Sequence, residues 1–277
     1  MKLARFTYQN NIGIGVVEGQ QLRNLSAVWS QAQGDVSSIL SVLDQVPAHS
    51  ETAPLIPLSA VELLAPLANP QHFFAVGLNY ADHAKEVGVE LPQRPRLFNK
   101  FNSAINAPRG YIAKPNFSDT LDYEGELCLV IGKPCFQVSA TQANQYIAGY
   151  VVLNDVSLRE YVNPDLLPLG KNCPTFAPFG PWLTTADEIE NPHNLIIKTW
   201  VNDELRQHSN TRELIFNCYQ LIEWISRAIP LMPGDMITTG SPHGSGIGFE
   251  PKRYLQVGDV VRVEISGLGM IEHTVCG

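Results

Sequence analysis

Hydrophobic and polar residues follow short runs or strict alternation along most of the chain, and long stretches of helical periodicity are rare. Residues 127–131 form an apolar run that ends in the β-branched pair Val130 and Ile131, which is typical of a buried strand. Residues 194–202 alternate instead, which indicates a strand with one buried face. Strands are expected on these grounds at 73–77, 127–131, 146–153, 194–202, 237–239, 260–265 and 270–275.

Two helices are predicted in the same region. Thr211 is expected to cap an amphipathic helix that stops at Pro230 and buries Leu214, Ile215, Cys218, Leu221, Ile222, Ile225 and Ile229. A helix of about eight residues is expected after Asn79 as N-cap and before Gly88 as C-cap, a length that is marginal in isolation. The proline-containing segment 89–96 follows it, so we expect this helix to belong to a lid that closes over a site.

The N-terminal part has a different character. Residues 1–25 are expected to form a small β-structure, and Asp35 can cap a short helix after it. Five prolines between 47 and 70 are expected to prevent regular structure, which indicates a connector. The chain is therefore predicted to have a small N-terminal unit, residues 1–65, and a larger catalytic domain, residues 70–277.

Charge and cysteine content limit which binding partners and which cellular compartment are expected. The net charge is −8 and Lys and Arg form no runs, so we expect neither nucleic acid nor a membrane as a partner. The sequence shows no signal-peptide pattern and no apolar run long enough to span a bilayer. Five cysteines without a C-x-x-C motif are typical of reduced thiols, so a cytoplasmic protein is expected.

The first candidate functional residues are Glu124 and Glu126, which lie just before the apolar run 127–131. Residues two apart in an extended chain face the same side, about 6–7 Å apart, so two carboxylates converge there. A divalent cation would relieve their repulsion, and carboxylate ligands favour Mg²⁺, Mn²⁺ or Ca²⁺ over Zn²⁺. Asp155, at the end of the next strand, is a candidate third ligand, and Arg159 a candidate anion-binding group. The alternative for Glu124 and Glu126 is that they are solvated residues at the start of a strand. The alternative for Asp155 is that it is a turn or cap residue.

Three further features could supply chemistry. His83 and Glu86 are three residues apart on the short helix and share a face, so the carboxylate can orient the imidazole as a base. Lys171 lies in an apolar, proline-rich segment and could face an oxyanion. Backbone amides of the glycine-rich loop after Thr239 could bind a carboxylate, although the loop is not a P-loop. A surface histidine and a solvent-exposed lysine are the alternatives for the first two.

Six motifs in order resemble one family. They are Gly-Leu-Asn-Tyr-Ala-Asp-His-Ala-Lys-Glu at 77–86, Asp-Tyr-Glu-Gly-Glu-Leu at 122–127, Tyr-Ile-Ala-Gly-Tyr at 146–150, Asn-Asp-Val-Ser at 154–157, Pro-Gly-Asp-Met-Ile at 233–237 and Thr-Gly-Ser-Pro at 239–242. Residues 70–277 thereby resemble the fumarylacetoacetate hydrolase family, of the bacterial acylpyruvate hydrolase and 5-carboxymethyl-2-hydroxymuconate isomerase type.

The resemblance implies an α+β, mostly β fold with a mixed β-sandwich or β-roll core, and a homodimer. It also implies one Mg²⁺ or Mn²⁺, with Ca²⁺ possible, held by Glu124, Glu126 and Asp155. The catalytic residues it implies are the lid-borne dyad His83 and Glu86, together with Lys171 near the substrate oxyanion. The substrate-binding positions it implies are Arg159, Tyr80, Thr239, Gly240 and Ser241.

The activity implied by the resemblance is hydrolysis of a C–C bond in an acylpyruvate-like 2-oxo acid through a metal-stabilised enolate. Isomerisation or tautomerisation, and decarboxylation of the oxaloacetate type, would use the same residues. A catalytically silent protein that binds metal and keto acid is the alternative of another class. Pro174 and Val162 depart from the family pattern, where Asp and a polar Gln are common, and Ser241 replaces the usual Thr.

Overall fold

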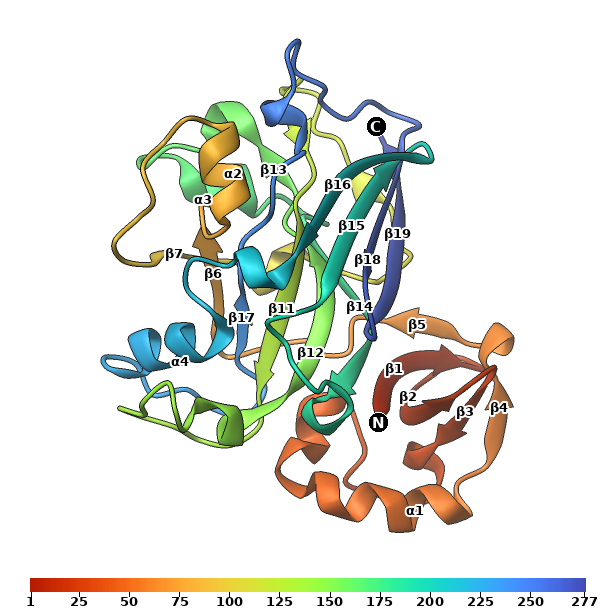
Figure 1. Cartoon of the computed structure of the whole chain (residues 1–277). Coiled ribbons are helices and arrows are strands. Elements are labelled where there is room, and N and C mark those ends of the chain that lie inside the picture. Colours follow the sequence, from red (N-terminus) through yellow and green to blue (C-terminus); the bar gives the residue numbers. More distant parts are fainter.

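The computed structural model describes residues 1–277, and strands dominate it (Figure 1). The strands are β1 Lys2–Tyr8, β2 Asn11–Glu18, β3 Gln21–Asn24, β4 Leu55–Pro57, β5 Glu62–Leu64, β6 Phe73–Gly77, β7 Arg96–Asn99, β8 Ile105–Asn106, β9 Ile112–Ala113, β10 Leu121–Asp122, β11 Gly125–Ile131, β12 Ile147–Asn154, β13 Ser157–Leu158, β14 Ala177–Thr185, β15 Ile196–Val201, β16 Glu204–Asn210, β17 Met236–Thr238, β18 Val260–Ile265 and β19 Gly269–Cys276. The helices are α1 Val46–Thr52, α2 Ala81–Glu86, α3 Leu167–Lys171 and α4 Cys218–Ser226, with 3₁₀ segments between them. The predicted mostly β fold is confirmed.

The strands form one large sheet, a smaller one and a two-stranded sheet of β10 and β13. The large sheet runs β4-β3-β2-β1-β14-β12-β11-β17-β6-β7, and the smaller runs β16-β15-β18-β19-β9. The central strand β11 is buried at all seven residues, since Leu127 and Leu129 face one apolar core while Cys128 and Val130 face the other. Burial on both faces explains why this strand reads as a continuous apolar run in the sequence.

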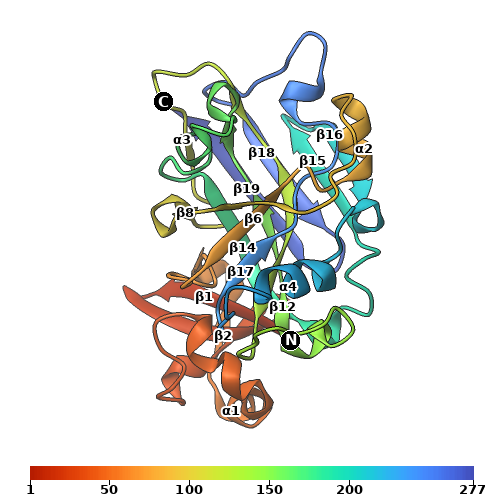
Figure 2. The ribbon, with the colours of Figure 1, turned by 90° about the vertical axis from the view of Figure 1, so that its left-hand side faces the viewer.

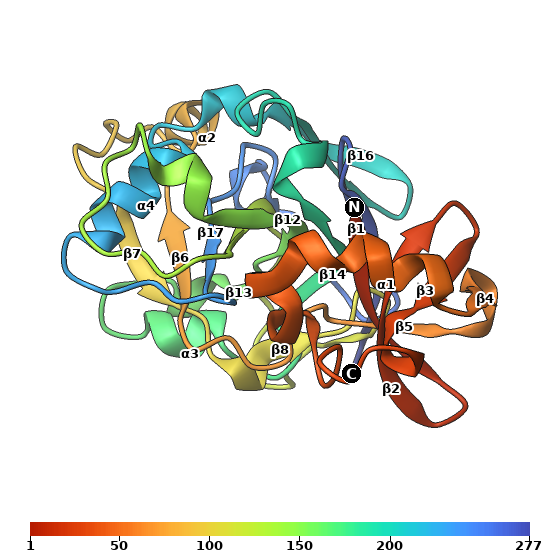
Figure 3. The same cartoon turned by 90° about the horizontal axis from the view of Figure 1, so that it is seen from below.

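The N-terminal unit continues the large sheet. Its strand β1 pairs with β14, with Leu3 opposite Leu183, and Leu3 shares a core of 34 buried residues with β11 and β14. The unit, red to orange, lies at one end of the molecule, and α2 and α3 lie toward the other end (Figures 1 and 2). Figure 3 shows the same unit from below, beside the sheet that it extends.

The prediction that prolines make 47–70 irregular is wrong. This segment contains most of α1 and the short strands β4 and β5. Pro47 lies in the first turn of α1, where its missing N–H has no helical partner in any case. Pro57 ends β4, which is the edge strand of the large sheet, and an edge tolerates a lost donor.

The predicted helix from Thr211 to Ile229 is also wrong in its first part. Only a 3₁₀ turn forms at Thr211–Glu213, and α4 begins at Cys218 under a capping box made by Asn217 and Gln220. Figure 2 shows α4 against the face of the large sheet. The intervening residues do not continue the helix because they bind the segment before α2: Leu214 bridges to Tyr80, and the Ile215 amide donates to the Asn79 carbonyl.

Asn79 does not cap α2 as predicted. Its side chain instead donates to the carbonyls of Phe216 and Thr239, at 2.9 and 2.8 Å, and accepts from the Phe216 amide at 2.9 Å. Three buried tertiary hydrogen bonds use every group that a cap would need. The resulting helix α2 has six residues and Tyr80 at its N-cap position, with no side-chain cap.

None of the helices has the length and apolar character needed to cross a membrane. All five cysteines are free thiols.

His273 on β19 gives the fold a testable pH dependence. Its Nε2 lies 3.0 Å from the Ala107 carbonyl oxygen, and burial lowers the pKa of His273 to about 4. In the unfolded chain the pKa of His273 is about 6.5, so the unfolded state is protonated at a higher pH than the folded state. The contribution of neutral His273 to stability is therefore full above pH 6.5 and is lost as pH falls toward 4. We expect the free energy of unfolding to fall by about 1.4 kcal/mol per pH unit in this window from His273 alone.

Urea unfolding of the wild type and of His273→Gln between pH 7 and pH 4.5 measures this slope. The variant should show the shallower slope, and His208→Gln, which alters an exposed histidine, serves as the control. Equal slopes in the wild type and His273→Gln would contradict the assignment.

Candidate active site

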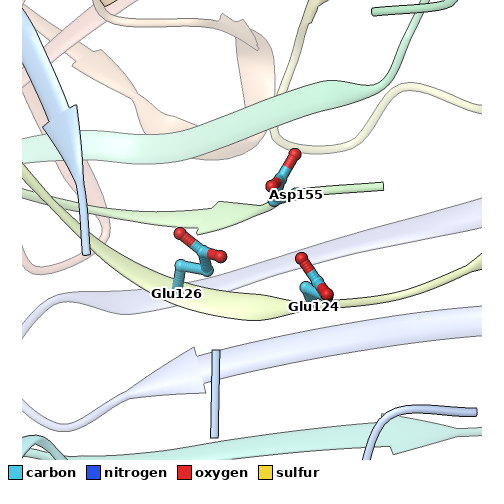
Figure 4. Close-up of side chains that lie close together, drawn as sticks. All are labelled: Glu124, Glu126 and Asp155. Carbon is cyan, nitrogen blue, oxygen red and sulfur yellow. The ribbon is translucent and has the colours of Figure 1, made fainter. Parts of the chain in front are cut away.

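Three carboxylates meet where β11 and β12 pair. Glu124 directly precedes β11, Glu126 is its second residue, and Asp155 directly follows β12. The antiparallel register sets Gly125 opposite Asn154, and the Asp155 amide donates to the Glu124 carbonyl at 2.8 Å. One ligand oxygen of each carboxylate lies within 4.8 Å of the others, and all three residues are buried (Figure 4). The structure thus brings together the three residues proposed as metal ligands.

Two lysines neutralise part of this cluster. Lys171, the last residue of α3, donates to Glu124 and to Asp155 Oδ2, the latter at 2.7 Å. Lys100, directly after β7, donates to Asp155 Oδ1 at 2.7 Å and to the carbonyls of Lys171 and Phe176. All three protons of the Lys100 ammonium are therefore used inside the protein, whereas Lys171 retains one.

Arg159 supplies the third cation. Its Nε donates to Asp122 Oδ2 and its Nη1 lies at Glu124 Oε1, both at 2.7 Å. Its Nη2 is buried and has no hydrogen-bond partner. Because an unpaired buried donor is costly, this nitrogen is suited to an anionic ligand.

The carboxylates differ in their electrostatic surroundings. Burial works to raise the pKa of Glu124, but Arg159 and Lys171 outweigh it and hold that pKa well below its usual range. Burial raises the pKa of Glu126 well above the usual range, and repulsion from Asp155 and Glu124 adds to the effect. Glu126 has no cationic partner and accepts only from the Thr238 hydroxyl and the Gly240 amide. A divalent cation would supply the missing charge, so the all-oxygen donor set fits Mg²⁺, Mn²⁺ or Ca²⁺.

The predicted dyad also forms. His83 Nδ1 lies 2.9 Å from Glu86 Oε2, and the Gly244 amide donates to Glu86 Oε1 at 2.9 Å. Partial burial works to raise the pKa of Glu86, but the hydrogen bonds from His83 and Gly244 outweigh it and lower that pKa. Glu86 is thus held as an anion that fixes the imidazole, and Nε2 is the ring nitrogen left for a substrate.

A cavity of about 400 Å³ joins the dyad to the carboxylates. His83, Arg159, Lys171, Ser241 and the three carboxylates line it. Its remaining wall is mainly apolar and includes Val76, Val87, Val89, Leu97, Phe98, Val162 and Leu167. The proposed metal site, the His83 base and two cationic side chains with free donors, Arg159 and Lys171, therefore share one cavity.

The other predicted substrate positions lie outside the cavity lining. Tyr80 is completely buried, the Thr239 hydroxyl donates to the Leu127 carbonyl, and the Gly240 amide donates to Glu126. Thr239 and Gly240 thus hold the strand that carries Glu126, and contact of the three residues with substrate stays a prediction.

The glycine-rich loop binds carboxylates of the protein itself. Its Gly244 amide holds Glu86, while the Gly246 and Ile247 amides hold Asp122 at 2.7 and 3.0 Å. Asp122 in turn holds Arg159. The loop therefore orients the base and the arginine at the same time.

Two departures from the family pattern have different consequences. Pro174 is exposed, and Lys171 already has Glu124 and Asp155 as partners, so it does not need an acidic residue at 174. Val162 lines the cavity, so this departure makes the wall more apolar.

Sequence reasoning missed Lys100 and Asp122. Lys100 follows an exposed edge strand, and only its burial and its contact with Asp155 reveal a role. Asp122 lies within a motif already singled out, but its partners are about 37 and 124 positions away.

A buried carboxylate triad beside a histidine–glutamate pair, on a β-rich scaffold, is the arrangement of a metal-dependent enzyme. Comparison with known proteins specifies the class further. Residues 72–276 match the model of the fumarylacetoacetate (FAA) hydrolase C-terminal family, and residues 1–66 match the Rv2993c-like N-terminal family. The chain belongs to the fumarylacetoacetate hydrolase family and is an enzyme of it.

Three relatives illustrate the range of activities. The mitochondrial oxaloacetate tautomerase Fahd2a of Rattus norvegicus is 44% identical over 224 residues, which cover 80% of this chain and 72% of the relative. The crystal structure of 5-carboxymethyl-2-hydroxymuconate delta-isomerase from Mycobacterium smegmatis is 32% identical, with a TM-score of 0.83 over 100% of this chain and 99% of that one. Maleylpyruvate hydrolase from Sphingobium sp. SYK-6, in complex with manganese (II) ion and pyruvate, is 29% identical with a TM-score of 0.83 over the same shares.

Removing the negative charge of Glu126 should weaken metal binding. Glu126→Gln keeps an oxygen for Thr238 and Gly240 but removes the one carboxylate that has no cationic partner. We expect calorimetric titration with Mn²⁺ to show at least a tenfold weaker affinity, because losing even an outer-shell partner of a metal ligand costs about 10–100-fold. Glu160→Gln, at an exposed acidic residue, should bind like the wild type, and unchanged affinity in Glu126→Gln would exclude the triad as the site.

Proposed function

We propose that the protein is a divalent-metal-dependent enzyme that interconverts the enol and keto forms of a 2-oxo acid. The observation that carries the proposal is that the His83–Glu86 dyad and the carboxylate triad line or border one cavity. Enolisation needs a base that moves a carbon-bound proton and a cationic environment for the developing enolate oxygen. The tautomerase and isomerase relatives support this reaction class.

Each residue of the cavity has a role in this proposal. The free Nη2 of Arg159 binds the carboxylate of the 2-oxo acid, and the remaining proton of Lys171 faces its keto oxygen. His83 takes the proton from the neighbouring carbon and returns it, while Glu86 keeps the imidazole oriented. Mg²⁺ or Mn²⁺, held by Glu124, Glu126 and Asp155, would act as a Lewis acid on the 2-oxo group.

Hydrolysis of a C–C bond in an acylpyruvate is the second candidate. The maleylpyruvate hydrolase relative favours it, and His83 would then take a proton from water instead of carbon. The apolar Val162 in the cavity wall offers no hydrogen bond to such a water, so we place hydrolysis second.

Turnover of three compounds tests the reaction class. Enol oxaloacetate, acetylpyruvate and a hydroxymuconate analogue are each followed by ultraviolet absorbance with Mg²⁺, with Mn²⁺ and with EDTA, and products are identified by NMR. EDTA-sensitive loss of the enol without C–C cleavage is the expected result. Release of pyruvate from acetylpyruvate would establish hydrolysis instead, and release of carbon dioxide from oxaloacetate would establish decarboxylation.

Loss of the base should separate catalysis from metal binding. We expect His83→Ala to lower kcat by roughly a hundredfold or more, the scale of general-base catalysis, because no other imidazole lines the cavity. Its affinity for Mn²⁺ should stay within about twofold of the wild type, since His83 is not a member of the triad. His208→Ala is the matched control, and unchanged turnover in His83→Ala would refute the dyad.

A further inference from the structure

Most of the charged side chains that line the cavity form ion pairs. Arg159 is bound to Asp122 and Glu124, and Lys171 is bound to Glu124 and Asp155. Of the positively charged side chains in the lining, only Arg96 has neither a hydrogen bond nor an ion pair.

Arg96 lies in the lining because of its place on β7. This strand is the edge of the large sheet, and Arg96 is paired with Gly77, a residue that also lines the cavity and has no side chain to fill the space. Phe98 is two residues further on, so both side chains lie on the same face of the strand, about 6–7 Å apart. The Phe98 ring centroid is 5.4 Å from Lys171 Nζ, which places this face of β7 toward the triad.

The surroundings of Arg96 contrast with those of the triad. Val87, Val89, Leu97 and Leu167 line the cavity with it, and the only other charged groups are the triad, its two cations and His83. A ligand that extends beyond the triad therefore meets apolar wall and a single unpaired guanidinium. A guanidinium with free N–H groups binds a carboxylate through two parallel hydrogen bonds.

We propose that Arg96 binds a second, distal carboxylate of the substrate and selects 2-oxo dicarboxylates over 2-oxo monocarboxylates. This inference rests on the proposed function, in which Arg159 takes the carboxylate next to the keto group. The two arginines then hold opposite ends of a dianion, with the enolisable carbon between them. Arg96 acts in binding and leaves the proton transfer to His83.

A matched pair of substrates isolates the distal carboxylate. Oxaloacetate carries this group as a charged carboxylate and its 4-methyl ester carries it as a neutral ester. The kcat/KM of each compound is measured with Mn²⁺ in the wild type, Arg96→Met and Arg96→Lys. We expect Arg96→Met to lose about ten- to a hundredfold on oxaloacetate, mainly through a higher KM, the scale for a charged hydrogen-bonded pair. Its kcat/KM for the ester should stay within about threefold of the wild type, and Arg96→Lys should be intermediate.

The control is Arg94→Met, which removes a neighbouring arginine that is exposed like Arg96 but does not line the cavity. Thermal unfolding of every variant confirms that the fold is kept. An unchanged kcat/KM for oxaloacetate in Arg96→Met, or an equal loss on both substrates, would overturn the proposal.

Equilibrium binding separates this inference from the proposed function. The dissociation constants of oxaloacetate and its ester are measured by calorimetry on the Mn²⁺-loaded protein, whether or not either compound is turned over. Tighter binding of the diacid that disappears in Arg96→Met supports the role of Arg96 even if the reaction is not an enol–keto interconversion. Equal binding of both compounds by the wild type would overturn it.

Discussion

The site depends on the burial of three carboxylates between two apolar cores. Burying a charge without a partner is prohibitively costly, so Glu124 and Asp155 require cations that are equally buried, whereas Glu126 has no cationic partner and leaves its charge for a metal ion. Lys100 and Lys171 provide them from segments that lie far apart in the sequence. The ion pairs therefore fix the end of α3 and the end of β7 against the paired strands β11 and β12, and these segments form the walls of the cavity.

The glycine-rich loop after β17 connects this charge network to the base. Its amides bind Glu86 on one side and Asp122 on the other, so His83 and Arg159 are oriented from a single loop. Gly244 has a positive φ, and a Cβ at this position would overlap the Arg206 backbone, so only glycine allows the loop to pass so close to β16. A change in this loop would thus reach the base and the arginine together.

The features of the fold and site that depend on local periodicity can be predicted from the sequence. The apolar run of β11 and the spacing of Glu124 and Glu126 follow directly from burial and from the two-residue repeat of a strand. Ion-pair partners from distant segments cannot be predicted from periodicity, so the role of Lys100, which binds Asp155, is not visible in the sequence. The side chain of Asn79 suits a helix cap, but its buried tertiary hydrogen bonds to Phe216 and Thr239 compete successfully with capping.

The pairing of β1 with β14 has a consequence for how the chain can be divided. Two sequence families meet between residues 66 and 72, which invites treatment of the N-terminal unit as a detachable module. The large sheet and the 34-residue core both include residues on either side of this boundary. A chain cut there would expose part of the backbone edge of β14 and the apolar partners of Leu3, surfaces that recruit neighbouring molecules. We therefore expect either fragment to aggregate when it is produced alone, and such aggregation would say little about catalysis.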